Sequence, residues 1–136
     1  MLTDTAIILA GGKSRRMGFD KQQLRIDGKL APVYLADQLS SLFSDIIIIS
    51  NKPELYSDCE YPVYEDRIRD FGPLGGLYTG LCNAKSRFAY LVACDMPHLN
   101  LDYIRYMRRL IREDPEVDAL VTLLHGDRSE PFNAFY

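Results

Sequence analysis

Short runs of consecutive apolar residues alternate with amphipathic segments along this chain, and the alternation restricts the fold more than any other feature of the sequence. The clearest runs are residues 6–10, 46–49 and 88–93. Strands that are apolar at every position are typical of a parallel sheet with both faces covered. The pattern therefore predicts buried parallel strands, each leading into a polar or glycine-containing loop.

Amphipathic segments separate these runs and are predicted to be helices. The first begins at Pro32, a residue favoured in the first turn of a helix, and Asp45 closes it. The second follows a polar, glycine-rich loop over residues 66–76, and the third spans residues 101–112, where apolar residues recur at helical spacing. Weaker strands are expected at residues 62–64, 118–124 and 131–136.

Strands that alternate with helices predict an α/β protein of three layers, α/β/α, in which helices cover both faces of a mainly parallel sheet. The length of 136 residues favours a single domain over residues 1–136, and no repeat or linker-like stretch divides it. In such sheets ligands bind beyond the carboxyl ends of the strands. Residues 11–21, Asn51 and Asp95 each follow a predicted strand, so we expect them to form one site.

The charge balance and the cysteines exclude several classes of protein. With 16 Lys and Arg against 19 Asp and Glu, the formal net charge of -3 does not favour binding to nucleic acid or to an anionic membrane. The longest aliphatic run, residues 46–49, is far short of the roughly 20 apolar residues of a membrane-spanning helix. Cys59, Cys82 and Cys94 lack the spacing of a zinc site, and no secretory signal is recognised. We therefore expect a reduced, cytoplasmic protein.

The segment LAGGKSRRMGFDK at residues 9–21 combines glycines with four cationic side chains. Glycines let backbone N–H groups approach a phosphate closely, and the cations neutralise a polyphosphate. Neither a Walker loop nor the dinucleotide fingerprint fits, because Ile7 and Lys13 stand where those motifs need glycine. A solvated basic loop with turn glycines is the alternative, and composition alone does not separate the two. The position directly after a strand favours phosphate binding.

Asp95 lies just beyond the predicted strand at residues 88–93, and its carboxylate is expected at the mouth of the sheet. Mg²⁺ prefers oxygen ligands and needs only one or two carboxylates when substrate phosphates complete its coordination. A turn residue or helix cap is the commoner role of a lone Asp, but the phosphate loop favours a metal site here. Cys94 is expected to be a small buried residue rather than a nucleophile, because the sequence marks no general base for it.

Four motifs resemble, in this order, the molybdenum cofactor guanylyltransferase family: LAGGKSRRMGFDK, GPLGG, ACDMP and EPFNAFY, which together span residues 9–136. The double glycine at Gly11 and Gly12 is more similar to guanylyl-transferring members than to cytidylyl-transferring ones. The resemblance implies a Rossmann-like nucleotidyltransferase fold and a Mg²⁺-dependent enzyme. In the implied reaction the phosphate of molybdopterin, which carries molybdenum, attacks the α-phosphorus of GTP, so that molybdopterin guanine dinucleotide and pyrophosphate form.

The resemblance also assigns residues position by position. It implies catalytic roles for Arg16, Lys21 and Asp95, with Asp95 as the Mg²⁺ ligand. The nucleotide-binding residues that it implies are Leu9, Ala10, Gly11, Gly12, Lys21, Asn51, Asp66 and Asp95. No nucleophilic side chain is needed, because phosphoryl-type transfer mainly requires in-line positioning and neutralisation of charge.

Three other functions stay open at this point: a molybdopterin cytidylyltransferase, a sugar-phosphate nucleotidyltransferase and a non-catalytic nucleotide-binding module. Members of the family continue beyond the EPFNAFY motif, so we expect the C-terminal part of the domain to be missing and, with it, a region that helps to bind molybdopterin. The expected partners are GTP and molybdopterin as small-molecule substrates. Transient contact with molybdenum-insertion or molybdoenzyme-maturation proteins is a further expectation from the resemblance.

Overall fold

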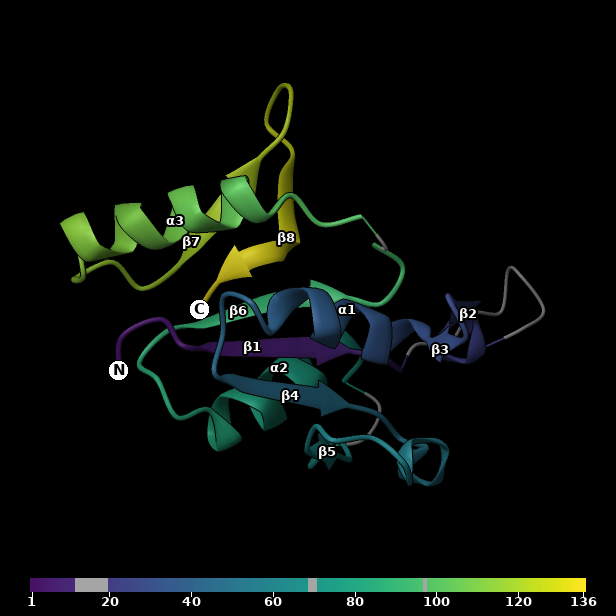
Figure 1. Ribbon diagram of the computed structural model, residues 1–136. Coiled ribbons are helices and arrows are strands. Elements are labelled where there is room, and N and C mark those ends of the chain that lie inside the picture. The colour runs from purple at the N-terminus through teal and green to yellow at the C-terminus, as the bar shows by residue number, and fades with distance from the viewer. Residues whose placement is uncertain (12–19, 69–70, 97) are drawn as a thin grey trace.

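A sheet of six strands forms the centre of the structure, a computed structural model that describes residues 1–11, 20–68, 71–96 and 98–136. The strand order is β5-β4-β1-β6-β8-β7, with β1 and β6 in the middle (Figure 1). The strands are β1 (Thr5–Leu9), β4 (Asp45–Ile49), β5 (Val63–Tyr64), β6 (Ala89–Ala93), β7 (Leu120–Leu123) and β8 (Ser129–Phe135).

The register of the central strands brings their carboxyl ends to one level. Strand β1 pairs in parallel with both β4 and β6, and Leu9 lies opposite Ile49 on one side and Ala93 on the other. Strand β5 is parallel to β4. All five residues of β1 and of β4 are buried, as expected for strands that are covered on both faces. The predicted mainly parallel sheet is confirmed.

The last two strands run against this direction. Strand β8 is antiparallel to both β6 and β7. The connection from Leu123 to Ser129 is too short for a parallel crossover, which needs about a dozen residues, so the chain must turn back on itself. Gly126 supports the turn with a φ of 78°. Strand β8 also begins at Ser129, earlier than the predicted strand at residues 131–136.

Three helices in the described part of the chain cover the two faces of the sheet: α1 (Ala31–Leu39), α2 (Pro73–Asn83) and α3 (Leu101–Glu113). Side chains of α1 and α3 share one apolar cluster with Ile8 and Ile48, whereas Leu77 of α2 packs on the opposite face against Ile7 and Ile47. Figure 1 shows α2 on the side of β1 and β4 away from α1. The predicted three-layer α/β/α architecture is therefore confirmed, and none of these helices is long and apolar enough to cross a membrane.

Two further predicted boundaries are wrong. The first helix ends at Leu39 rather than near Asp45, which begins β4. The buried Asp45 carboxylate accepts hydrogen bonds from the Thr5 hydroxyl (2.7 Å) and the Lys85 backbone N–H (3.0 Å), so it belongs to the sheet. The glycine-rich loop expected at residues 66–76 ends earlier, because α2 already begins at Pro73.

Three short elements were not predicted. A hairpin joins β2 (Arg25–Ile26) to β3 (Lys29–Leu30), and its turn places Asp27 and Gly28 at positive φ angles of 52° and 78°. The Asp-Gly pair is a known signal for such turns. Two 3₁₀ turns, η1 (Lys21–Gln23) and η2 (Pro53–Tyr56), complete the described elements.

Glycines let α2 lie directly on the central strands. A Cβ atom on Gly76 would come within 2.6 Å of Leu9 Cδ2, and one on Gly80 would meet three side-chain atoms of Ile7 at 2.6 to 2.9 Å. Contacts this short do not occur between real side chains. The helix therefore sits closer to β1 than any larger residue would allow, and its first turn reaches the carboxyl end of that strand.

We predict that Gly80→Ala destabilises the chain, although alanine is the better helix former. The added methyl overlaps Ile7, and overpacking of this kind costs about 1–3 kcal/mol of unfolding free energy. Urea denaturation followed by circular dichroism measures it. Cys82→Ala, at an exposed position of the same helix, is the control and should shift stability by less than about 0.5 kcal/mol. A Gly80→Ala variant as stable as the parent would contradict the close packing of α2.

Candidate functional site

The carboxyl ends of β4, β1 and β6 are joined by backbone hydrogen bonds just beyond the strands. The Ala10 N–H donates to the Ile49 carbonyl (2.9 Å), and the Cys94 N–H donates to the Leu9 carbonyl (3.0 Å). The Leu9 and Ala10 side chains are buried at 7% and 2% exposure. Leu9 and Ala10 therefore offer little surface to a ligand, and their backbone groups serve to join the strand ends.

A hollow opens between these strand ends and the amino end of α2. It brings together four of the predicted residues, Leu9, Gly11, Asn51 and Asp66, although they come from three separate parts of the chain. A Cβ on Gly11 would lie 3.9 Å from the Asn51 backbone nitrogen, so the two loops run close together. The complete lining is Leu9, Gly11, Ile49, Ser50, Asn51, Asp66, Gly72, Pro73 and Gly76.

Asp66 carries an unusual oxygen atom at this hollow. Its backbone N–H donates to the Asn51 side-chain oxygen at 3.4 Å, but its buried Oδ1 has no hydrogen-bond partner among the described residues. Burial raises the pKa of the Asp66 carboxyl above its usual value, and the nearby Asn51 amide only partly opposes this. A buried acceptor without a donor costs free energy, so the site favours a ligand that brings one.

Lys21 and Asp95 form the second part of the site, on the β6 side of β1. The Lys21 Nζ lies 3.8 Å from Asp95 Oδ2, and their side chains are 38% and 51% exposed. The predicted pair is thus together and open to solvent. Gly12 and Arg16, the two other predicted residues of the first loop, lie outside the described residues.

The Asp95 carboxylate can serve as one ligand of Mg²⁺, provided that the substrate phosphates and water supply the others. No group of three or more His, Cys, Asp or Glu side chains suited to a metal occurs in the described ranges, so these ranges hold no protein cage for a metal. Mg²⁺ usually keeps one or two carboxylates and takes its other ligands from substrate phosphates and water. A solvent-facing carboxylate beside a lysine meets that requirement.

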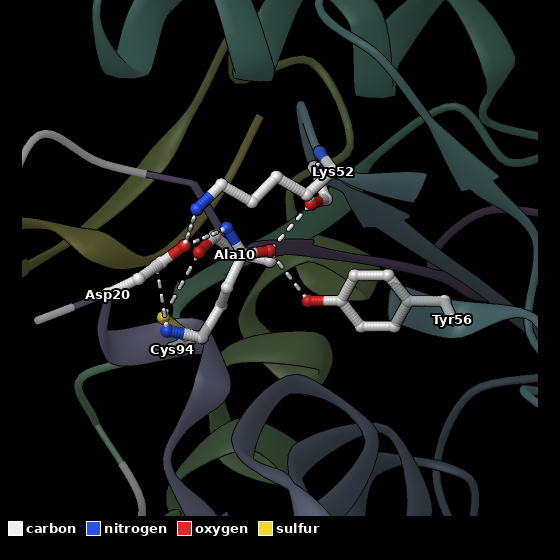
Figure 2. Close-up of polar contacts among 7 residues, drawn as sticks. Ala10, Asp20, Lys52, Tyr56 and Cys94 are labelled. Atoms are coloured by element: carbon white, nitrogen blue, oxygen red, sulfur yellow. Dashed lines mark hydrogen bonds and ion pairs between the residues drawn. The ribbon is translucent and has the colours of Figure 1, made fainter. Parts of the chain in front are cut away.

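A buried polar network that sequence reasoning missed supports Lys21 (Figure 2). The Gln22 side chain, 3% exposed, accepts hydrogen bonds from the Ser50 hydroxyl (2.6 Å) and the Tyr56 hydroxyl (2.9 Å). It donates to Asp20 Oδ2 (3.0 Å), and Lys52 Nζ lies 2.8 Å from the same oxygen. Burial raises the pKa of Asp20, but the hydrogen bonds from Lys52 and Gln22 outweigh it, so the net pKa is below the usual value. Burial likewise raises the pKa of Tyr56.

Cys94 lies next to this network, and its thiol is not suited to act as a nucleophile. Its thiol is half-buried, and the Sγ contacts the Ala10 carbonyl oxygen at 3.5 Å. Burial and the neighbouring Asp95 and Asp20 charges raise the pKa of Cys94 to about 11. The thiol is therefore protonated at neutral pH and is a weak nucleophile.

We predict that Asp66→Asn stabilises the chain at pH 7, by on the order of 1 kcal/mol. A carboxyl with a raised pKa in the folded chain binds its proton more tightly when folded. Its favourable contribution is therefore complete below the unfolded value of about 3.8 and is lost as the pH rises through the raised pKa. Urea denaturation at pH 7 and near pH 4 should show the advantage of the variant shrinking toward acid pH. Asp58→Asn, at an exposed carboxyl, is the control. A variant that is less stable than the parent at pH 7 would be contrary to this account.

Comparisons with known proteins match almost the whole chain. A family model described as MobA-like NTP transferase domain covers residues 6–136. The chain is 53% identical over 132 residues to the molybdenum cofactor guanylyltransferase of Syntrophotalea carbinolica and 48% identical over 139 residues to a probable molybdenum cofactor guanylyltransferase of Peptoclostridium acidaminophilum. These alignments include 97% and 99% of the chain but 62% of each relative, so the chain spans about 62% of their length.

A solved structure shares the fold. The crystal structure of molybdopterin-guanine dinucleotide biosynthesis protein A from Archaeoglobus fulgidus matches with a TM-score of 0.79 at 22% identity. The match covers 97% of this chain and 66% of that one. At this identity the likeness bears on the fold, and it agrees with the predicted Rossmann-like nucleotidyltransferase architecture.

Proposed function

The chain belongs to the MobA-like NTP transferase domain family, and we propose that it binds GTP with Mg²⁺ as the nucleotide-binding part of a molybdenum cofactor guanylyltransferase. Relatives with 53% and 48% identity carry that name. The activity proposed for the whole enzyme is the transfer of GMP from GTP to molybdopterin, with release of pyrophosphate. For the chain itself, as a single nucleotidyltransferase domain, the proposal is binding and alignment of GTP.

The unpartnered oxygen of Asp66 is the observation that carries the choice of base. A carboxylate only accepts hydrogen bonds, and the buried Oδ1 of this one has no donor among the residues that the structure describes. Guanine offers adjacent donors, the ring N1–H and the exocyclic amino group. Cytosine offers a single donor group, its exocyclic amino group, next to the ring N3 acceptor, so one carboxylate oxygen would face an acceptor, at a cost of about 1–3 kcal/mol. The hollow therefore favours guanine, with the Asn51 side chain beside it.

Lys21 and Asp95 suit the phosphates. The Lys21 ammonium would hold the phosphate chain, and the exposed Asp95 carboxylate beside it would hold Mg²⁺. When bound, Mg²⁺ supplies neutralisation of the phosphates and of the leaving pyrophosphate. Leu9 and Gly11, which line the hollow, would border the nucleotide together with Ala10 between them. Gly12 and Arg16 keep their predicted roles in this proposal.

No residue of the chain needs to act as nucleophile. The attacking group is a phosphate oxygen of molybdopterin, which is already anionic at neutral pH, so a strong general base is unnecessary. The contribution of the chain is to align the α-phosphate and to neutralise charge, and Lys21 contributes to both. A cytoplasmic location and transient partner proteins are part of the same proposal.

Calorimetric titration of the chain with GTP and, separately, with CTP, each with Mg²⁺, tests this function. Selective binding of GTP is expected. Preference for CTP would assign a cytidylyl-transferring enzyme and overturn the role given to Asp66. Failure to bind either nucleotide would contradict the proposed function of the chain.

We predict that Lys21→Ala weakens GTP binding by about 10- to 100-fold, the range expected for loss of a charged hydrogen bond. Binding of guanosine should change little, because the ammonium contacts only phosphate. Titrations with GTP and guanosine measure the two losses. Lys85→Ala removes the same charge at the amino-terminal end of the strands, where the Lys85 N–H donates to Asp45, and is the control. Equal losses for GTP and guanosine would count against a phosphate role.

We predict that Asp95→Ala removes most of the Mg²⁺ dependence of GTP binding. The Asp95 side chain is half exposed and pairs with Lys21 alone among the described residues, so the fold should lose less than about 1 kcal/mol. GTP titrations with Mg²⁺ and with a chelator give the ratio to compare. Asp102→Ala, at an exposed carboxylate of α3, is the control. An unchanged Mg²⁺ effect in Asp95→Ala would exclude the carboxylate as ligand.

A further inference from the structure

Gln22 is a buried side chain whose hydrogen-bonding groups are largely occupied. Its Oε1 accepts from the Ser50 hydroxyl at 2.6 Å and from the Tyr56 hydroxyl at 2.9 Å, and its Nε2 donates to Asp20 Oδ2 at 3.0 Å. A primary amide is costly to bury unless it is hydrogen-bonded. Its burial here at 3% exposure, next to a residue that faces solvent, indicates that it holds the chain in place.

Asp20 and Gln22, the residues on either side of Lys21, are hydrogen-bonded to each other. Asp20 caps the 3₁₀ turn η1 by accepting the Gln22 backbone N–H at 3.2 Å, and it is held in turn by Lys52 Nζ at 2.8 Å. Lys21 therefore projects from a turn that is fastened at its preceding and its following residue. Its own side chain is 38% exposed, and its ion pair with Asp95 joins it to the end of β6.

Ser50, the residue to which Gln22 fastens this turn, also lines the hollow proposed for the base. Ser50 lines that hollow together with Asn51, and the Ser50 hydroxyl oxygen accepts the Lys52 N–H at 3.0 Å while donating to Gln22. Tyr56 comes from η2, farther along the chain. One side-chain amide thus connects the turn that carries Lys21 to the strand end that borders the base.

We infer that Gln22 is a positioning residue: it fastens η1 to the end of β4 and so fixes Lys21 relative to the base hollow. The inference rests on the proposed function, because it is the phosphate chain of GTP that Lys21 would meet. The inference requires that Gln22 act through Lys21 and not through Ser50, its hydrogen-bond partner at the hollow. Loss of Gln22 should therefore affect ligands with phosphates and should have no effect once Lys21 itself is gone.

A double-mutant cycle tests this dependence. Gln22→Met keeps the length of the side chain and removes its three hydrogen bonds, and it should weaken GTP binding about tenfold while guanosine binding stays within twofold. In a Lys21→Ala background the same change should have no further effect on GTP binding. Independent, additive losses, or an equal loss of guanosine affinity, would overturn the inference. If Gln22→Met does not fold, Tyr56→Phe removes one of the bonds without changing the ring and carries the same cycle.

A second measurement does not depend on nucleotide binding. Acylation of lysines by an amine-specific reagent, read by peptide mass spectrometry, reports the freedom of Lys21 directly, and the exposed Lys85 serves as the internal reference. Gln22→Met should raise the Lys21 rate several-fold, toward the rate in Asp95→Ala, in which the ion pair is removed. An unchanged Lys21 rate would overturn the inference. If the parent chain binds no GTP but the labelling rate rises, the proposed function fails and the positioning of Lys21 by Gln22 stands.

Discussion

The close contact between α2 and β1 determines the geometry of the rest of the molecule. Gly76 and Gly80 allow the helix to rest on Leu9 and Ile7, and β1 pairs in register with both β4 and β6. A shift of the helix would therefore displace the central strand and, through it, both of its neighbours. Because the helix begins at Pro73, the same contact brings its first turn to the hollow where the three strand ends meet. Packing on one face of the sheet thus fixes the dimensions of the site at the carboxyl ends of the strands.

The parallel strands were predictable because each is apolar along nearly its full length, a pattern that few other structures produce. The helix boundaries were less predictable than the strands. Leu42 and Phe43 extend the apolar periodicity past Leu39, yet they pack on the core from a turn, and spacing alone does not distinguish the two cases. The sequence of the first turn of α2 predicts a loop, because its glycines disfavour a helix by about 1 kcal/mol each. Close packing on the sheet overrides that preference, and a preference read from sequence contains no information on packing.

The site shows a similar division. Lys21, Asn51 and Asp95 could be found because they follow predicted strands in a sheet of known polarity, and the family resemblance, which the comparisons confirm, supplied Asp66. Gln22 could not be found. It is a polar residue in a polar segment, and its burial depends on Ser50 and Tyr56, which follow it by 28 and 34 residues. Contacts across such distances arise only when the fold is complete.

The buried Asp66 oxygen, which has no hydrogen-bond partner in the described part of the chain, would link the stability of the protein to a ligand that brings a donor. A molecule that folds around an unmatched acceptor reaches its full stability only when a donor arrives, so each occupied molecule is more resistant to unfolding than an empty one. Cellular proteases act on the unfolded fraction. The amount of this protein that survives in a cell would then rise and fall with the concentration of the small molecule that fills the hollow.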